Sequence, residues 1–191
     1  MQPSPQGYRA RFEQAARSLL AGGVIAYPTE AVYGLGCLPL QRRAVERLLA
    51  IKRRSWRKGL AVIAADLTQL EPLVVLPSGR MGAQILASWP GPATWLLPAR
   101  PAVPYWLNGG RDTLAVRVTD HPLANELCRR VASPLVSTSA NRSGRPPLRR
   151  ALLVRREFAA ELDCVLAGAL GGSSGPTAIR DGRTGELLRA S

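Results

Sequence analysis

The sequence contains few of the side chains that form disulfide frameworks and metal centres. It has three cysteines, Cys37, Cys128 and Cys164, with no CxxC pair among them, and one histidine, His121. An odd cysteine count argues against a disulfide scaffold, and a structural zinc site needs clustered cysteines and histidines. We therefore expect a reducing, cytoplasmic environment and no metal ligands from protein side chains.

Long hydrophobic runs and the common nucleotide-binding loops are also missing. No apolar run approaches the ~20 residues of a membrane span, and residues 1–7 lack the basic-then-apolar pattern of a secretion signal. We expect no membrane partner. The Walker phosphate loop is absent, and Gly34 and Gly36 are not followed by the third glycine of a dinucleotide fingerprint. Aromatic residues make up 5% of the chain, which argues against an RRM-type platform for RNA.

The charge balance is strongly basic. The chain has 26 lysines and arginines against 13 acidic residues, a net charge of +13. Such a surplus predicts attraction to phosphates, although solubility alone is another reading of it. Only two of the basic residues are lysines, Lys52 and Lys58, and they lie in one short segment. A lysine meets a phosphate as a compact point charge, so this segment is a candidate phosphate site.

The hydrophobic pattern predicts one mixed α/β domain over residues 1–191, because a chain of this length with 46% hydrophobic residues can bury its own core. Helix and strand patterns alternate irregularly, without an internal repeat. We expect helices at 8–21, 41–52, 66–74, 79–88, 121–131 and 149–160, and strands at 24–27, 60–64, 94–97, 113–118, 135–139, 164–166, 177–179 and 186–189. Residues 29–36 are expected as a loop or a distorted strand. Asp120 is the expected cap of the fifth helix and Pro122 its first residue.

Four polar segments follow or interrupt the predicted strands, at residues 28–36, 52–60, 113–117 and 137–144. Ligands of α/β sheets gather at loops beyond strand ends. Together the segments supply hydroxyls, one carboxylate and several cations, which is an inventory suited to a phosphate ligand.

Each segment also has a purely structural reading. Thr29 and Glu30 could simply turn the chain, and the cations after residue 51 could be a solvated helix end. Arg117 is different, because a lone charge in an apolar strand is costly unless it is paired or faces a cleft. We expect His121 to cap or pack and not to act in a catalytic triad.

These segments together resemble the YrdC-like threonylcarbamoyl-AMP synthases over nearly the whole chain, from about residue 22 onward. YPTEAVYGLG at 27–36 is similar to the family's PTE-x-x-YGLG signature, and residues 52–60 are similar to its K-x-R-x-x-x-K-[GP]-L segment. LAVRVTDHP at 114–122 and STSANRSG at 137–144 match two further family motifs. Four long motifs in the right order are far more specific than any one of them.

The resemblance implies a twisted mixed parallel and antiparallel sheet, flanked by helices, that opens onto a large basic cavity. It implies a nucleotidyltransferase that forms threonylcarbamoyl-AMP and pyrophosphate from ATP, L-threonine and bicarbonate, with Mg²⁺ accompanying the nucleotide. Transfer enzymes of the same pathway would then pass the threonylcarbamoyl group to an adenosine of tRNA. The basic surface is compatible with direct contact to tRNA, but the sequence does not decide whether tRNA is bound directly.

The resemblance assigns roles by position. Lys52 and Arg54 would be catalytic residues that hold ATP phosphates. The other expected ATP contacts are Lys58, Thr113, Ser139 and Asn141, and the expected threonine contacts are Thr29, Arg117 and Ser137.

The chain departs from the family pattern at several positions. Ala31 stands where many members have threonine, and Ile63 where longer relatives have histidine. Thr177 is a weak candidate in a late family segment, and the sequence shows no C-terminal linker or extra domain. A second hypothesis is an RNA-binding module without catalysis, but it gives no reason for the ordered motifs.

Overall fold

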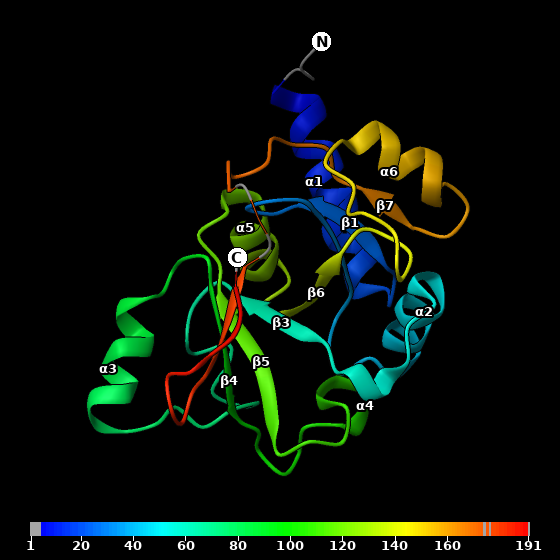
Figure 1. The fold of residues 1–191 in the computed structure, drawn as a ribbon. Helices are drawn as coiled ribbons and strands as arrows, with labels where there is room; N and C mark the ends of the chain where they lie inside the picture. Colours follow the sequence, from blue (N-terminus) through cyan, green and yellow to red (C-terminus); the bar gives the residue numbers. More distant parts are fainter. Residues whose placement is uncertain (1–4, 174, 176, 191) are drawn as a thin grey trace.

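A computed structural model describes residues 5–173, 175 and 177–190, and a nine-stranded sheet runs through the whole of this part (Figure 1). The strand order is β7-β1-β2-β6-β3-β5-β4-β8-β9. The strands are β1 (Ile25–Pro28), β2 (Tyr33–Gly36), β3 (Ala61–Ala64), β4 (Ala93–Pro98), β5 (Thr113–Val118), β6 (Leu135–Ser139), β7 (Cys164–Val165), β8 (Ala178–Asp181) and β9 (Leu187–Arg189). The helices are α1 (Pro5–Leu20), α2 (Arg42–Lys52), α3 (Gly79–Ala87), α4 (Tyr105–Asn108), α5 (Pro122–Arg130) and α6 (Ala151–Phe158), with a short 3-10 turn, η1 (Trp56–Lys58).

The sheet mixes both strand directions, as the sequence pattern predicts. The pairs β1–β7, β3–β5 and β4–β8 are parallel, and the other neighbours are antiparallel. β6 pairs with β2 on one side and with β3 on the other, so the STSAN segment at its end lies in the middle of the sheet. This placement brings segments from both halves of the chain to one site.

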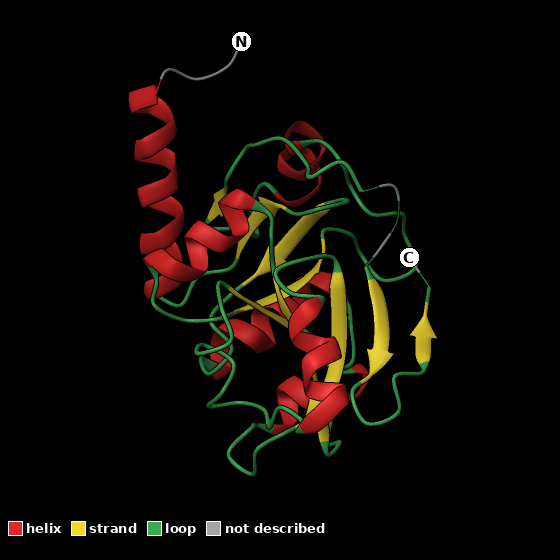
Figure 2. Cartoon of the chain, turned by 90° about the vertical axis from the view of Figure 1, so that its left-hand side faces the viewer, coloured by secondary structure: helices red, strands yellow, loops and turns green. Residues whose placement is uncertain are grey.

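Both faces of the sheet are covered by hydrophobic side chains, and β3 contributes to each. Its Val62 joins a large cluster with residues of α2, such as Leu48, while its neighbour Ile63 joins a smaller one with Leu19 of α1 and Leu127 of α5. Successive side chains of a strand point to opposite faces, which explains the division. Figure 2 shows α1 at one side of the molecule, with its first turns extending beyond the sheet.

Two expectations about the elements are wrong. Residues 66–74 form successive turns instead of a helix. Asp120 is not the cap of α5: His121 occupies that position with extended backbone and no side-chain capping bond, although Pro122 is the first helical residue as predicted. Turns and caps depend on local hydrogen bonds, here including one from the hydroxyl of Thr68 to Asp66 at 2.5 Å, which hydrophobic periodicity does not report.

None of the helices in the described part of the chain combines the length and the apolar character that crossing a lipid bilayer requires.

Candidate functional site

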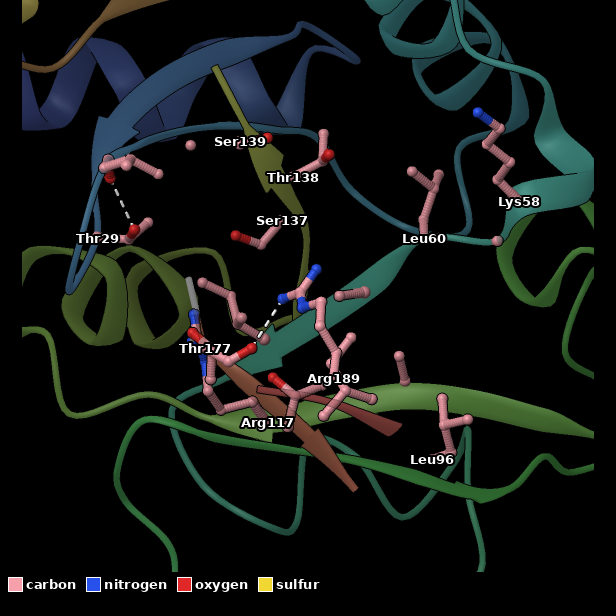
Figure 3. A pocket seen from close by; sticks show the side chains of 18 of the residues that line it. Thr29, Lys58, Leu60, Leu96, Arg117, Ser137, Thr138, Ser139, Thr177 and Arg189 are labelled. Atoms are coloured by element: carbon pink, nitrogen blue, oxygen red, sulfur yellow. Dashed lines mark hydrogen bonds between the residues drawn. The ribbon is translucent and has the colours of Figure 1, made fainter. Parts of the chain in front are cut away.

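A cavity of about 820 Å³ opens where β2, β3, β5 and β6 face the C-terminal strands β8 and β9 (Figure 3). Its lining contains six cationic side chains and no carboxylate among the residues that the structure describes. The cations are Arg54, Lys58, Arg111, Arg117, Arg149 and Arg189. Charges of one sign focused in a concave site favour an anionic ligand.

Hydroxyl groups complete the lining. Thr29 follows β1, Thr113 begins β5, Ser137, Thr138 and Ser139 end β6, and Thr177 precedes β8. Seven of the nine residues expected from the sequence therefore meet in one cavity. They are Thr29, Arg54, Lys58, Thr113, Arg117, Ser137 and Ser139.

The Thr29 side chain is fixed by a tight turn after β1. Its hydroxyl donates to the carbonyl oxygen of Val32 at 2.7 Å, and its backbone N–H donates to the same oxygen at 3.1 Å. Gly34 makes this packing close: a Cβ there would lie 3.1 Å from Cγ2 of Thr29 and 3.5 Å from Oγ of Ser137. Glycine at this position therefore keeps Thr29 and Ser137 next to each other at the cavity wall.

Arg117 meets both alternatives expected for a charge in an apolar strand. Its guanidinium is paired with a carboxylate, and its side chain also lines the cavity. Its Nη2 lies 3.1 Å from Oε2 of Glu30, and both side chains are less than a tenth exposed. Oε1 of Glu30 accepts a hydrogen bond from Thr119 at 2.6 Å, and Nη1 of Arg117 donates to the hydroxyl of Thr177. Thr177, the weak candidate, is thus part of the site.

Lys52 and Asn141 lie behind the lining and not in it. The Lys52 ammonium donates to three acceptors of the STSAN segment: the carbonyl of Ser139, the carbonyl of Asn141 at 2.9 Å and Oδ1 of Asn141 at 3.1 Å. The same Oδ1 accepts the Ser139 hydroxyl at 2.6 Å. Burial, and secondarily the charge of Arg54, lowers the pKa of Lys52 to about 8. In this structure the ammonium orders the segment that carries Ser139.

The positive charges of Arg54, Arg117 and Arg189 repel one another. Burial, and then the nearby charge of Arg189, lowers the pKa of Arg54. Burial, and then the charge of Arg117, lowers the pKa of Arg189. Nη2 of Arg54 donates to the carbonyl of Gly59 at 2.9 Å, and Nη2 of Arg189 to that of Thr177 at 2.8 Å, so each holds its position through a neutral acceptor. A bound anion would relieve this repulsion.

The sequence analysis did not identify Arg111, Arg149 and Arg189. Arg111 and Arg149 lie in loops before β5 and α6, and Arg189 ends β9. Among so many arginines, no local pattern separates these from the rest. Arg189 alone had a signal, because it closes the segment expected as the last strand, and strand ends are where ligands gather.

The remaining reactive groups of the described residues are structural. His121 accepts or donates one hydrogen bond, between Nε2 and the carbonyl of Ala169 at 3.1 Å, which fits the packing role expected for it. The three cysteines are free and buried, and burial raises the pKa values of Cys37 and Cys128 to about 12. These thiols are not nucleophiles near neutral pH.

Comparisons with known proteins identify relatives of this chain. The chain matches the sequence profile of the Sua5/YciO/YrdC family, described as "Telomere recombination", over residues 17–191. It is 55% identical over 179 residues to the threonylcarbamoyl-AMP synthase of Nitrosococcus oceani, which covers 94% of this chain and 97% of that protein. It is 52% identical over 190 residues to the threonylcarbamoyl-AMP synthase of Halorhodospira halophila, which covers 99% of this chain and all of that protein.

Solved structures show the same fold. The structure of P. abyssi Sua5 complexed with L-threonine aligns with a TM-score of 0.83 and 33% identity over 99% of this chain. This chain spans 55% of that longer protein. E. coli YciO aligns with a TM-score of 0.78 and 26% identity, over 94% of this chain and 85% of its own. The chain belongs to the Sua5/YciO/YrdC family.

Proposed function

We propose that this chain is a threonylcarbamoyl-AMP synthase, which makes threonylcarbamoyl-AMP and pyrophosphate from ATP, L-threonine and bicarbonate. The observation that carries the proposal is the cavity lining, six cations and several hydroxyls without a described carboxylate. The two synthases at 55% and 52% identity, aligned almost end to end, support the same reaction. The threonine complex of P. abyssi Sua5 supports threonine as one substrate.

The proposed reaction needs no covalent enzyme intermediate. The amine of threonine adds to the carbon of bicarbonate and water leaves, which gives a carbamate. A carbamate oxygen then attacks the α-phosphorus of ATP, and pyrophosphate leaves with the electrons of the broken P–O bond. Catalysis of such a transfer rests on positioning and on fixed positive charge, which this cavity offers.

We assign threonine to the end of the cavity formed by Thr29, Arg117 and Ser137. The guanidinium of Arg117 would meet the substrate carboxylate through charge-assisted hydrogen bonds, and the two hydroxyls flank that position. Ile63 and Ala31 also line this region, so they would contact apolar parts of the amino acid. With Ala31 in place of a family threonine, the hydroxyls of this end are those of Thr29, Ser137 and Thr177.

We assign the nucleotide to the part of the cavity lined by Arg54 and Lys58. Arg54 and Lys58 would contact the phosphates, with Arg189 as a third cation, while Thr113 and Ser139 offer hydroxyls to the nucleotide. The proposal changes the roles of Lys52 and Asn141. Because their side chains lie behind the lining, we assign them to positioning Ser139 and not to direct contact with ATP.

Mg²⁺ enters the proposal as part of the nucleotide complex. Among the described residues, no group of three His, Cys, Asp or Glu side chains could hold a metal ion. Mg²⁺ is commonly bound through substrate phosphates with few protein ligands, and the lining hydroxyls are compatible with that arrangement. When bound, the ion would neutralise phosphate charge beside Arg54 and Lys58.

A direct test is mass spectrometric detection of the adenylate after the protein is mixed with Mg–ATP, L-threonine and isotopically labelled bicarbonate. We expect a product that carries the bicarbonate label, and pyrophosphate release that stops when either threonine or bicarbonate is omitted. Arg54→Gln should remove most of this activity, whereas Arg42→Gln, an exposed change outside the cavity, should not. Pyrophosphate release that is independent of threonine would contradict the proposal.

The proposed product is an activated intermediate, so a following enzyme must transfer its threonylcarbamoyl group. A threonylcarbamoyl adenylate is a mixed anhydride that water destroys, so an enclosed cavity and a short route to the next enzyme both preserve it. We propose transfer enzymes for tRNA, in the cytoplasm, as the consumers of this product.

A further inference from the structure

The chain after β7 lies against the residues that follow β1 at the cavity wall. We define the strap as residues 168–173, which continue from β7 towards α5 (Figure 1). The N–H of Gly171 donates to the carbonyl oxygen of Thr29 at 3.1 Å. The N–H of Ser173 donates to the carbonyl oxygen of Glu30 at 2.9 Å. The strap therefore extends the parallel pairing of β7 with β1 onto the two residues that begin the cavity wall.

Tyr33 anchors the first residue of the strap. Its hydroxyl donates to the carbonyl oxygen of Gly168 at 2.8 Å and accepts the backbone N–H of the same residue at 3.1 Å. The side chain is buried and belongs to the larger hydrophobic cluster. Both hydrogen bonds of this hydroxyl go to a residue 135 positions away in the sequence. The hydroxyl of Tyr33 therefore holds the strap, while its ring packs in the core.

His121 anchors the second residue of the strap. Its Nε2 lies 3.1 Å from the carbonyl oxygen of Ala169, and because a carbonyl only accepts, this nitrogen carries the proton. Nδ1 of the same ring is buried without a hydrogen-bond partner in the described part of the chain. Buried polar atoms are rarely left unpaired, so the orientation of the ring favours the strap at the expense of Nδ1. His121 precedes α5, which packs in the smaller hydrophobic cluster, so the two anchors hold the strap from opposite faces of the sheet.

Glycine allows the strap to lie close to the residues after β1. A Cβ at Gly171 would lie 2.9 Å from Cα of Glu30 and 3.4 Å from Cδ2 of His121. Three of the six strap residues are glycines, which lose more conformational freedom on ordering than any other residue. A segment of this composition needs hydrogen bonds to stay in one place, and the side chains of Tyr33 and His121 provide them.

The chain continues from the strap to Thr177, which contacts two arginines of the cavity (Figure 3). The hydroxyl of Thr177 accepts a hydrogen bond from Nη1 of Arg117. Its carbonyl oxygen accepts one from Nη2 of Arg189 at 2.8 Å. The strap and Thr177 thus make three contacts with the proposed threonine end, through Thr29, Glu30 and Arg117, and one with the proposed nucleotide site. A displaced strap should therefore disturb the threonine end more.

We propose that Tyr33 and His121 are positioning residues for threonine binding, which act through the strap. Neither side chain lines the cavity, so neither touches a substrate. By fixing the strap, they keep the backbone of Thr29 and Glu30 in place, and with it the Thr29 hydroxyl and the pair of Glu30 with Arg117. The inference rests on the proposed function, which assigns threonine to this end of the cavity. A role in stability alone would instead weaken the binding of both substrates together.

Hydrogen exchange and threonine binding test the proposal with the full chain. In Tyr33→Phe and in His121→Leu, the amides of the strap should exchange about fivefold faster than in the wild type, because local opening becomes easier. Isothermal titration should show L-threonine binding about fivefold more weakly, the effect of one lost neutral hydrogen bond. The KM for threonine should rise by the same factor, with the KM for ATP and kcat nearly unchanged. Gly171→Ala should act in the same way, because its Cβ pushes the strap away from Glu30.

Two further variants serve as controls. His121→Gln keeps an N–H donor for the carbonyl of Ala169, so it should restore the slow exchange and the threonine affinity that His121→Leu loses. Tyr105→Phe removes the hydroxyl of an exposed tyrosine outside the cavity and should match the wild type in every measurement.

The inference is overturned if Tyr33→Phe leaves the exchange of the strap unchanged, or if the strap exchanges faster while threonine binds as in the wild type. Equal losses of threonine and ATP affinity, with a lower melting temperature, would also overturn it, because they would show a role in stability alone. Failure of the proposed function is a different result. In that case the wild type binds threonine and the variants bind it more weakly, yet no adenylate forms.

Discussion

Arg117 and Glu30 form a buried ion pair at the wall of the cavity, with Nη2 3.1 Å from Oε2 and each side chain less than a tenth exposed. The contact is not aligned as a hydrogen bond, since Oε2 of Glu30 has no hydrogen-bond partner among the described residues. Oε1 of Glu30 is tied to Thr119 at 2.6 Å. Glu30 therefore fixes the side chain of Arg117, whose Nη1 also donates to Thr177 and whose buried Nε has no hydrogen-bond partner among the described residues.

Replacing Glu30 should separate threonine binding from nucleotide binding. In Glu30→Gln the size is kept but the charge that holds Arg117 is lost. We expect the KM for threonine to rise about tenfold, because a charge-assisted contact is misplaced, with a smaller change in the KM for ATP. An uncompensated buried arginine should also lower the free energy of unfolding by roughly 3 kcal/mol.

The matched control is Glu13→Gln, which removes a carboxylate from an exposed pair with Arg130 at 2.7 Å. Exposed pairs contribute little, so both the kinetics and the stability should stay near those of the wild type. Equal increases in the two KM values for Glu30→Gln would show that Glu30 supports the whole cavity and not Arg117 in particular.

Much of the fold and the site could be predicted because the sequence is locally consistent. α2 and β5 form close to the predicted bounds, since both have a regular apolar period. Arg117 was identifiable because a charge inside an apolar strand demands a partner or a cleft, and it has both. The ordered motifs placed Thr29 and Ser139 in the same site.

The features that the sequence did not predict depend on contacts between distant segments. Lys52 was expected in the cavity, but its ammonium turns to carbonyls of β6 and the residues after it, a choice visible only in three dimensions. Arg189 reaches the cavity because β8 pairs with β4 and β9 with β8, and sequence patterns do not give strand order. α4 is a four-residue helix, too short for any periodicity.

A substitution at Gly36 would test how closely β2 packs against β6. A Cβ at this position would lie 2.5 Å from the carbonyl oxygen of Val136 and 2.8 Å from Cε1 of Tyr27, and both neighbours are buried. Backbone cannot yield as a flexible side chain does, so β2 would have to move away from β6. We expect Gly36→Ala to lower the free energy of unfolding by about 2 kcal/mol in denaturant titrations. A variant as stable as the wild type would mean that the sheet adjusts here at little cost.

The lowered pKa of Lys52 predicts that the free energy of unfolding depends on pH. Its pKa is lowered to about 8 in the folded protein, below its ordinary value of 10.5. The folded state therefore pays a penalty to keep the ammonium charged below pH 8, and the penalty is relieved as pH rises from 8 towards 10.5. Relative to Lys52→Met, the free energy of unfolding of the wild type should rise by about 2 kcal/mol between pH 8 and 9.5. If the difference in free energy of unfolding between the two proteins does not change with pH, the pKa of Lys52 is close to its ordinary value. Its three hydrogen-bond acceptors would then offset the effect of burial.

Arg189 should show a conflict between stability and activity. Its pKa is lowered by burial and by the charge of Arg117, so like charges lie close together here, and an anionic substrate would offset them. Arg189→Gln should therefore raise the KM for ATP about tenfold, through the loss of one charge-assisted contact, and weaken inhibition by pyrophosphate. Its melting temperature should equal or exceed that of the wild type in calorimetry. The comparison is Arg183→Gln in the same hairpin, whose side chain pairs with Asp112 at 2.6 Å outside the cavity and should leave ATP binding unchanged. Equal effects of the two substitutions on ATP would mean that general positive charge, and not the position of Arg189, binds the nucleotide.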